Sequence, residues 1–278
     1  MDEQKHPALS LLSELSSICR IGHSILISHL VDRVGKYESE ITALSLSMLA
    51  VRHAEGVASC GELGPSGFPP MAACGRSALE VGAVSAWLIN ADDPMDREGR
   101  WLGYYKAYQR YWHALAAETI ETVEGERIAF EALGSAHEAW RAAIEAALPV
   151  GRVVLPPNFL DILTDLGSSS IYPAYRTASQ LVHGAPPAQD FIRTVEYVRE
   201  AGDNSNPFKA KSVTLSFGDF VHATDWVGPI RMGAFGVVRS ISELCKRLTG
   251  TPLDTSQLSE SYAALLLHTE EFCIASSL

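Results

Sequence analysis

One segment of the chain is apolar on almost every side of any helix it could form. It runs from Met71 to Ile89, and small residues make up much of it. A helix of this composition has no polar face to turn toward water, so it belongs at the centre of a protein with other elements packed closely around it. The sequence therefore predicts a closely packed helical core around this segment.

Elsewhere, apolar residues recur at three- and four-residue spacing, as amphipathic helices require. Clusters of glycine and proline, such as those at 61–70 and 184–187, end the periodic segments. We expect a kink at Gly228 and Pro229, and an irregular excursion over 188–215, near which 212–217 alternates like a short β strand. The other expected helices cover 8–34, 38–60, 94–120, 126–147, 158–166, 171–183, 217–248 and 255–274.

Length and composition favour a single all-α domain over residues 1–278, with a core at 39–187 on which the C-terminal helices, 217–275, pack. The net charge of −11 excludes extensive coating by nucleic acid but leaves room for a local basic pocket that receives one RNA segment. The five scattered cysteines favour reduced thiols. Without a visible signal peptide or membrane span, we expect a cytoplasmic protein that does not contact membranes.

The candidate functional site is one face of the helix expected at 171–183. Arg176 and His183 are seven residues apart, which is about two helical turns, so both lie on this face together with Tyr175 and Ser179. A histidine can exchange protons near neutral pH, and an arginine can stabilise a pentavalent phosphate. The alternative is that His183 caps the helix end while Arg176 pairs with an acid.

Arg76 and Glu80 are the only charged residues in the central apolar segment, and their spacing places them on one face of it. If this face meets the helix of His183, the Glu80 carboxylate could hold the imidazole in one tautomer. Alternatively, the pair fixes the register of the helices and takes no part in chemistry.

A metal site is the next candidate, but carboxylate-bridged dimetal centres use Glu-x-x-His on each of two helices, and the chain has this pattern only once, at Glu3 and His6. We therefore interpret the acidic helix face as solvated and expect neither metal nor cofactor; its residues are His113, Glu118, Glu121 and Glu124. The aromatic stripe of Tyr105, Tyr108 and Trp112 is interpreted as core packing rather than base stacking.

Three stretches carry a resemblance to a known family: Arg76-Ser-Ala-Leu-Glu80 with Trp87 after it, the aromatic run 104–112, and Tyr175-Arg-Thr-Ala-Ser-Gln-Leu-Val-His183-Gly184. Together they resemble the DUF5677 family of helical bacterial proteins, which is itself similar to the HEPN superfamily. The resemblance spans about 43–188.

This resemblance implies a homodimeric, metal-independent endoribonuclease of a stress or phage-defence system, with RNA as its partner. Arg176 and His183 would be catalytic and would cleave through the ribose 2′-hydroxyl, Ser179 and Tyr175 would assist, and Arg76 and Glu80 would orient them. Thr177 stands where active members usually carry Asn, Asp or His. The rival hypothesis is a non-catalytic helical module that binds a partner protein or a small ligand, with the same residues as a buried polar network.

Overall fold

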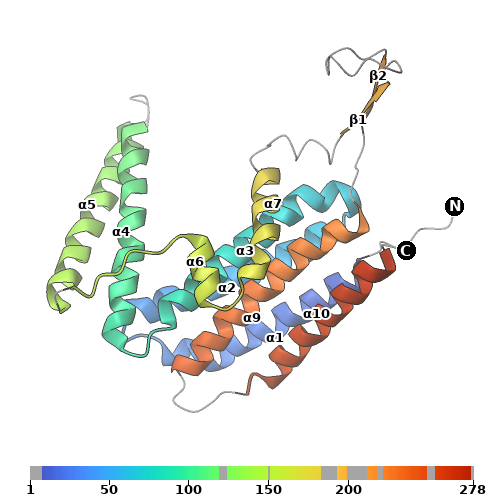
Figure 1. The fold of residues 1–278 in the computed structure, drawn as a ribbon. Coiled ribbons are helices and arrows are strands. Elements are labelled where there is room, and N and C mark those ends of the chain that lie inside the picture. Colours follow the sequence, from blue (N-terminus) through green and yellow to red (C-terminus); the bar gives the residue numbers. More distant parts are fainter. Residues whose placement is uncertain are drawn as a thin grey trace.

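The computed structural model describes residues 8–118, 124–149, 151–182, 193–198, 212–217, 222–248 and 254–276. It confirms the expected all-α bundle. At its centre, α3 (Phe68–Ile89) packs against α2 (Glu38–Gly61) and α9 (Val227–Leu248), which also pack on each other (Figure 1). Helix α9 therefore lies within the core and is buried along most of its length.

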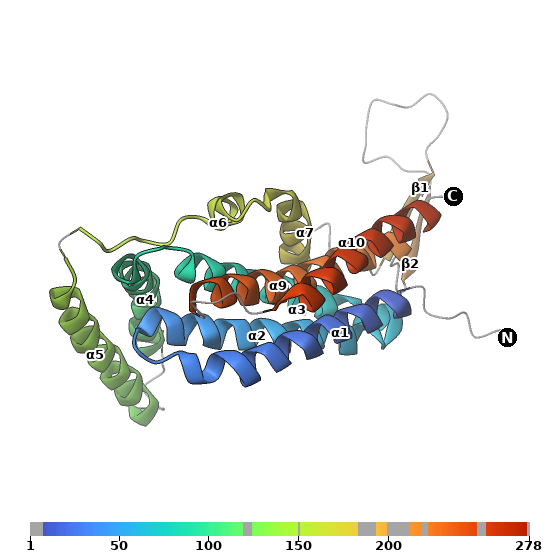
Figure 2. The ribbon, with the colours of Figure 1, turned by 90° about the horizontal axis from the view of Figure 1, so that it is seen from below.

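The remaining helices cover this core from different sides. Helices α1 (Leu9–Ile25) and α10 (Ser256–Ser276) contact each other and α9. Figure 2 shows α6 (Phe159–Asp165) and α7 (Tyr172–Val182) on the side of α3 and α9 opposite α1 and α2. None of the helices in the described ranges is long and apolar enough to cross a bilayer.

Helices α4 (Pro94–Glu118) and α5 (Glu124–Ala147) form a hairpin that extends away from one end of the bundle (Figure 1). Trp101 is buried at the base of this hairpin. The ring of Tyr105 is stacked on the ring of Trp101, with 5.0 Å between centroids, and Trp140 packs against Trp101 in a T-shaped arrangement, with 5.1 Å between centroids. Tyr105 therefore packs against the core, as the stripe predicted. The side chains of Tyr108 and Trp112 lie outside the described residues.

The structure corrects two expected helices. The first α-helix ends at Ile25 and continues as a π-helical turn, η1 (Leu26–Leu30), and a 3₁₀ turn, η2 (Val31–Arg33). The helix expected from 217 begins only at Val227, after the 3₁₀ turn η6 (Ala223–Trp226). Gly228 and Pro229 thus lie in its first turn, where a proline's missing N–H costs nothing, and they introduce no kink.

The expected strand over 212–217 is present. It is β2 (Ser212–Phe217), and it pairs antiparallel with β1 (Arg193–Val198), with Arg193 opposite Phe217. Two further 3₁₀ turns, η3 (Gly64–Gly67) and η5 (Ser169–Ile171), lead into α3 and α7.

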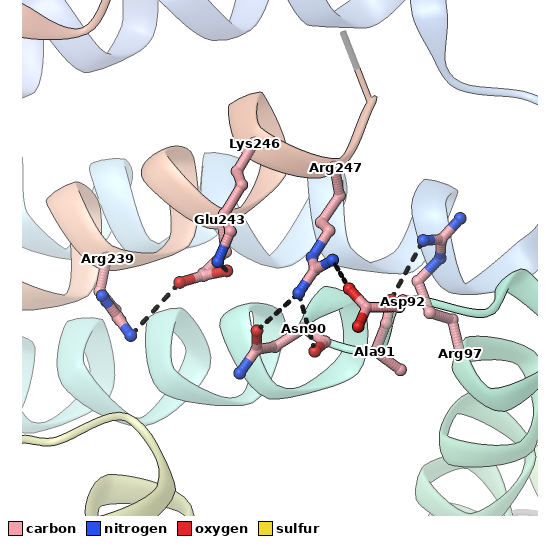
Figure 3. A network of polar contacts seen from close by, with 8 residues as sticks. All are labelled: Asn90, Ala91, Asp92, Arg97, Arg239, Glu243, Lys246 and Arg247. Atoms are coloured by element: carbon pink, nitrogen blue, oxygen red, sulfur yellow. Dashed lines mark hydrogen bonds and ion pairs between the residues drawn. The ribbon is translucent and has the colours of Figure 1, made fainter. Parts of the chain in front are cut away.

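The loop between α3 and α4 is held by arginines from two other elements (Figure 3). Arg247 of α9 pairs with Asp92 and donates from Nη2 to the carbonyl oxygen of Asn90 at 3.3 Å. Arg97 of α4 donates to the carbonyl oxygen of Ala91 at 3.2 Å. These contacts fix the direction in which the α4–α5 hairpin leaves the bundle.

Glycines allow the backbones of α3 and α9 to touch. A Cβ atom added at Gly236 would lie 2.2 Å from the carbonyl oxygen of Ala78, and one added at Gly82 would lie 2.3 Å from that of Gly236. Such distances are far below van der Waals contact, and the obstructing atoms are backbone. The small residues of the central segment are therefore required by this crossing.

We predict opposite effects of two Gly→Ala substitutions on α9. Gly236→Ala should lower the free energy of unfolding by about 2 kcal/mol, because the new methyl group forces the helices apart. At Gly233 the nearest atoms, in Ala54 and Val57, lie at ordinary contact distances of 3.5 Å. Gly233→Ala should therefore raise stability by up to about 1 kcal/mol through helix propensity. Urea denaturation measures both, and equal effects would contradict the crossing described here.

Candidate functional site

Helix α7, which carries most of the predicted site, lies on both central helices. It contacts α3 and α9, and Ala178 on its inner face is buried. The approach to α9 is close, since a Cβ atom at Gly228 would lie 3.6 Å from the Cβ of Ala174. Small residues on α7 and α9 thus determine how closely α7 packs on α9.

Tyr175 is held in a packed cluster of rings. Its ring centroid lies 4.4 Å from that of Phe159 and 5.8 Å from that of Tyr172. The guanidinium carbon of Arg76 lies over the ring of Tyr175, 5.4 Å from its centroid. An arginine in this position is attracted to the negative face of the aromatic ring. The contacts of Tyr175 are therefore those of a packing residue.

Arg76 faces α7, where it contacts Tyr175, but its pair with Glu80 is partly open to water. Arg76 Nη2 lies 3.6 Å from Glu80 Oε2, and the two side chains are 22% and 44% exposed. Arg76 Nε is buried and has no hydrogen-bond partner within the described part of the chain. Glu80 also borders a cavity of about 270 Å³ beside Tyr104 and Phe159.

Arg176 lies on the outward side of α7, away from this cluster, and is exposed. Of the arginines whose side chains the structure describes, it alone has no hydrogen bond, ion pair or ring contact. Its neighbour Thr177 donates from its hydroxyl to the carbonyl oxygen of Pro173 at 3.2 Å. The hydroxyl group of Thr177 therefore has its hydrogen-bond acceptor within α7.

The predicted site thus divides into two groups. Tyr175, Arg76 and Glu80 form one cluster between α3 and α7, whereas Arg176 stands apart from it. Ser179 is half-buried between these two sides of α7. His183 lies outside the described residues, so its predicted contact with Glu80 stays a prediction.

The structure describes too little of the acidic helix to place its four candidate metal ligands. The side chains of His113, Glu118 and Glu124, and all of Glu121, lie outside the described residues. Within the described ranges, no group of three or more His, Cys, Asp or Glu side chains is placed to hold a metal ion.

The sequence interpretation missed a row of residues on α9. Arg231, Phe235 and Arg239 border a cleft of about 690 Å³ between α9, α10 and the start of α7. With Glu243 they recur at four-residue spacing, which places them along one ridge of a helix. That spacing was visible in the sequence, but only the fold shows that α10 and the turn before α7 leave a cleft beside Arg231, Phe235 and Arg239.

Comparison of the chain with models of known protein families, with curated proteins and with solved structures finds no match.

We predict that Tyr175 and Arg176 differ in their effects on stability. Tyr175→Ala should lower the free energy of unfolding by about 2 kcal/mol, because it removes a partly buried ring from the cluster. Tyr175→Phe and Arg176→Ala should each change it by less than about 0.5 kcal/mol. Thermal and urea denaturation test this. A large loss in Tyr175→Phe would show that the hydroxyl group, and not the ring, holds the cluster together.

Proposed function

We propose that this protein is a metal-independent endoribonuclease of the HEPN-like kind, with its working face on the outward side of α7. The observation that carries the proposal is the state of Arg176, which is exposed and, unlike the other arginines with described side chains, has no partner. Leaving a guanidinium group unpaired keeps its donors available for a phosphate. The seven-residue spacing from Arg176 to His183 in the sequence predicts that the imidazole lies near the same face of the helix.

The proposed reaction needs no group beyond the protein and RNA. The ribose 2′-hydroxyl loses its proton and attacks the adjacent phosphorus, a new P–O bond forms, and the bond to the 5′-oxygen of the next nucleotide breaks. The products are a 2′,3′-cyclic phosphate and a 5′-hydroxyl. His183 transfers protons, and Arg176 stabilises the charge of the pentavalent phosphate.

A single histidine cannot at once remove one proton and deliver another, so a homodimer that brings two such faces together would supply both groups. In this proposal Ser179 adds a donor to the phosphate. Tyr175, Arg76 and Glu80 act by holding α7 against α3, which is consistent with their packed contacts. We propose a role for this activity in stress or phage defence.

One observation favours the rival function, a non-catalytic module that binds a partner protein or a small ligand. Among the six predicted site residues, Arg76 contacts both Tyr175 and Glu80 in a partly buried cluster, as in a structural polar network. The two functions differ in their outcome with RNA, since the rival predicts no cleavage.

The test is incubation of purified protein with total RNA in the presence of a chelator. We expect cleavage by the wild type and a loss of about a hundred-fold or more in His183→Ala and Arg176→Ala, which is the size of effect that general acid–base and anion-stabilising groups have. Mapping of the fragment ends should find cyclic phosphates.

Arg52→Ala is the matched control. Arg52 is also highly exposed, at 67% of its side-chain area, but it lies on α2 and pairs with Glu55. Its loss should leave the cleavage rate unchanged. Absence of cleavage by the wild type, or equal cleavage by the wild type and His183→Ala, would refute the proposed nuclease.

A further inference from the structure

The cleft of about 690 Å³ lies on a different part of the molecule from the proposed nuclease face. It is lined by residues of the turn before α7, of α9 and of α10, and Arg176 does not border it. Its walls include Ser168 and Ile171 ahead of α7, Phe235, Arg239 and Ser242 on α9, and Tyr262 on α10. Sites for small molecules in proteins have volumes of about 300–1,000 Å³, so this cleft has the size of one.

The middle of the cleft is apolar. Phe235 and Val238 of α9 are 6% and 8% exposed and form part of its floor, while Leu266 of α10 and Ala174 of α7 stand at its sides. Water in contact with such a surface is displaced favourably by an apolar group of a ligand. The cleft therefore suits a ligand with an apolar body.

The two arginines at the cleft are in different states. Arg231 is largely satisfied: its Nε donates to Thr269 Oγ1 at 2.8 Å, and its Nη2 lies 3.6 Å from Glu270 Oε1. Arg239 makes only one charged contact, from Nη2 to Glu243 Oε1 at 3.3 Å, and its Nε is buried without a partner among the described residues. The side chain of Arg239 is 35% exposed and borders the cleft, and the described residues leave part of the donor capacity of its guanidinium group unused.

The charge around Arg239 is also unbalanced. The carboxylate of Glu243 is buried and lies between Arg239 and Lys246, whose Nζ is 3.9 Å away (Figure 3). Two cations share this one anion, while Arg247 beyond them is paired with Asp92. The end of the cleft at Arg239 therefore has an excess of positive charge. At the other end, the charges of Arg231 and Glu270 balance each other.

We propose that this cleft binds a small organic anion that has an apolar body, such as a carboxylate, sulfonate or phosphate monoester on a ring or a short chain. Its charged group contacts the free donors of Arg239, assisted by the hydroxyl groups of Ser242 and Ser168. Its body lies along Phe235 and Val238 toward α10. This site does not depend on the proposed nuclease activity.

The test uses anilinonaphthalene sulfonate, an aromatic anion whose fluorescence rises in apolar surroundings. The folded wild type should bind it saturably, and Arg239→Gln should raise the dissociation constant about ten-fold or more, which is the usual effect of losing a charge-assisted hydrogen bond. Arg52→Gln, a matched change on α2, should leave the dissociation constant unchanged.

Arg239→Gln removes the closest partner of buried Glu243, so the variant could lose stability. Two further variants keep the test valid. Arg239→Lys retains a cation beside Glu243 but loses the planar guanidinium group, and we expect weaker binding than in the wild type. Ser242→Trp leaves Arg239 intact and fills the cleft, and it should abolish binding. Each variant's melting curve is measured in parallel.

Competition identifies the kind of ligand. Decanoate, which has a carboxylate and an apolar chain, should displace the probe, whereas inorganic phosphate at the same concentration should not. The proposal is overturned if the folded wild type binds no probe, if Ser242→Trp binds it as well as the wild type does, or if inorganic phosphate competes as well as decanoate.

Discussion

The contact between the backbones of α3 and α9 is the constraint on which the rest of the structure depends. Two helices with side chains at the crossing would stand well apart, but here Gly82 and Gly236 let them meet backbone to backbone. Close packing of this kind provides many weak dispersion contacts and tolerates little change in volume. It also makes α3 and α9 a surface of two adjacent helices, and α7 packs against both.

Both candidate sites are built on that surface. Helix α7 lies across α3 and α9 and contacts them through small residues such as Ala174 and Ala178, which leaves Arg176 on the outside. The same arrangement leaves α9 uncovered between α7 and α10, and this gap is the cleft at Arg239. The outward face of α7 and the cleft are thus two results of one packing arrangement, although their chemistry is independent.

Much of the fold could be predicted from local sequence patterns. Apolar periodicity gave the positions of α2, α3, α5 and α10 to within a few residues, because each has continuous helical spacing and distinct end signals. The start of α9 was wrong because Phe217, Phe220 and Val221 recur at three- and four-residue spacing, as in a helix. The π-helical turn after α1 was missed because it continues the same amphipathic pattern.

The candidate site was predictable only in part. Spacing along one helix placed Tyr175 and Arg176 on the same face of α7, and it could not show that Tyr175 turns toward Arg76 while Arg176, the next residue, turns to solvent. The partial exposure of Arg76 and Glu80 was likewise invisible, because an apolar segment predicts burial of the whole helix and not which edge remains open. The cleft at Arg239 is formed by elements that are far apart in the chain, and local sequence patterns do not predict which distant elements pack together.

The position of α9 late in the chain has a consequence for the synthesis of this protein. Helix α3 follows α2, which covers one of its sides, but α9, the helix that fits its glycine face, is made only after α4 to α7 and the strands. During that interval the growing chain exposes a surface that other chains can bind. A chain truncated before α9 keeps this surface of α3 uncovered, and we expect it to aggregate.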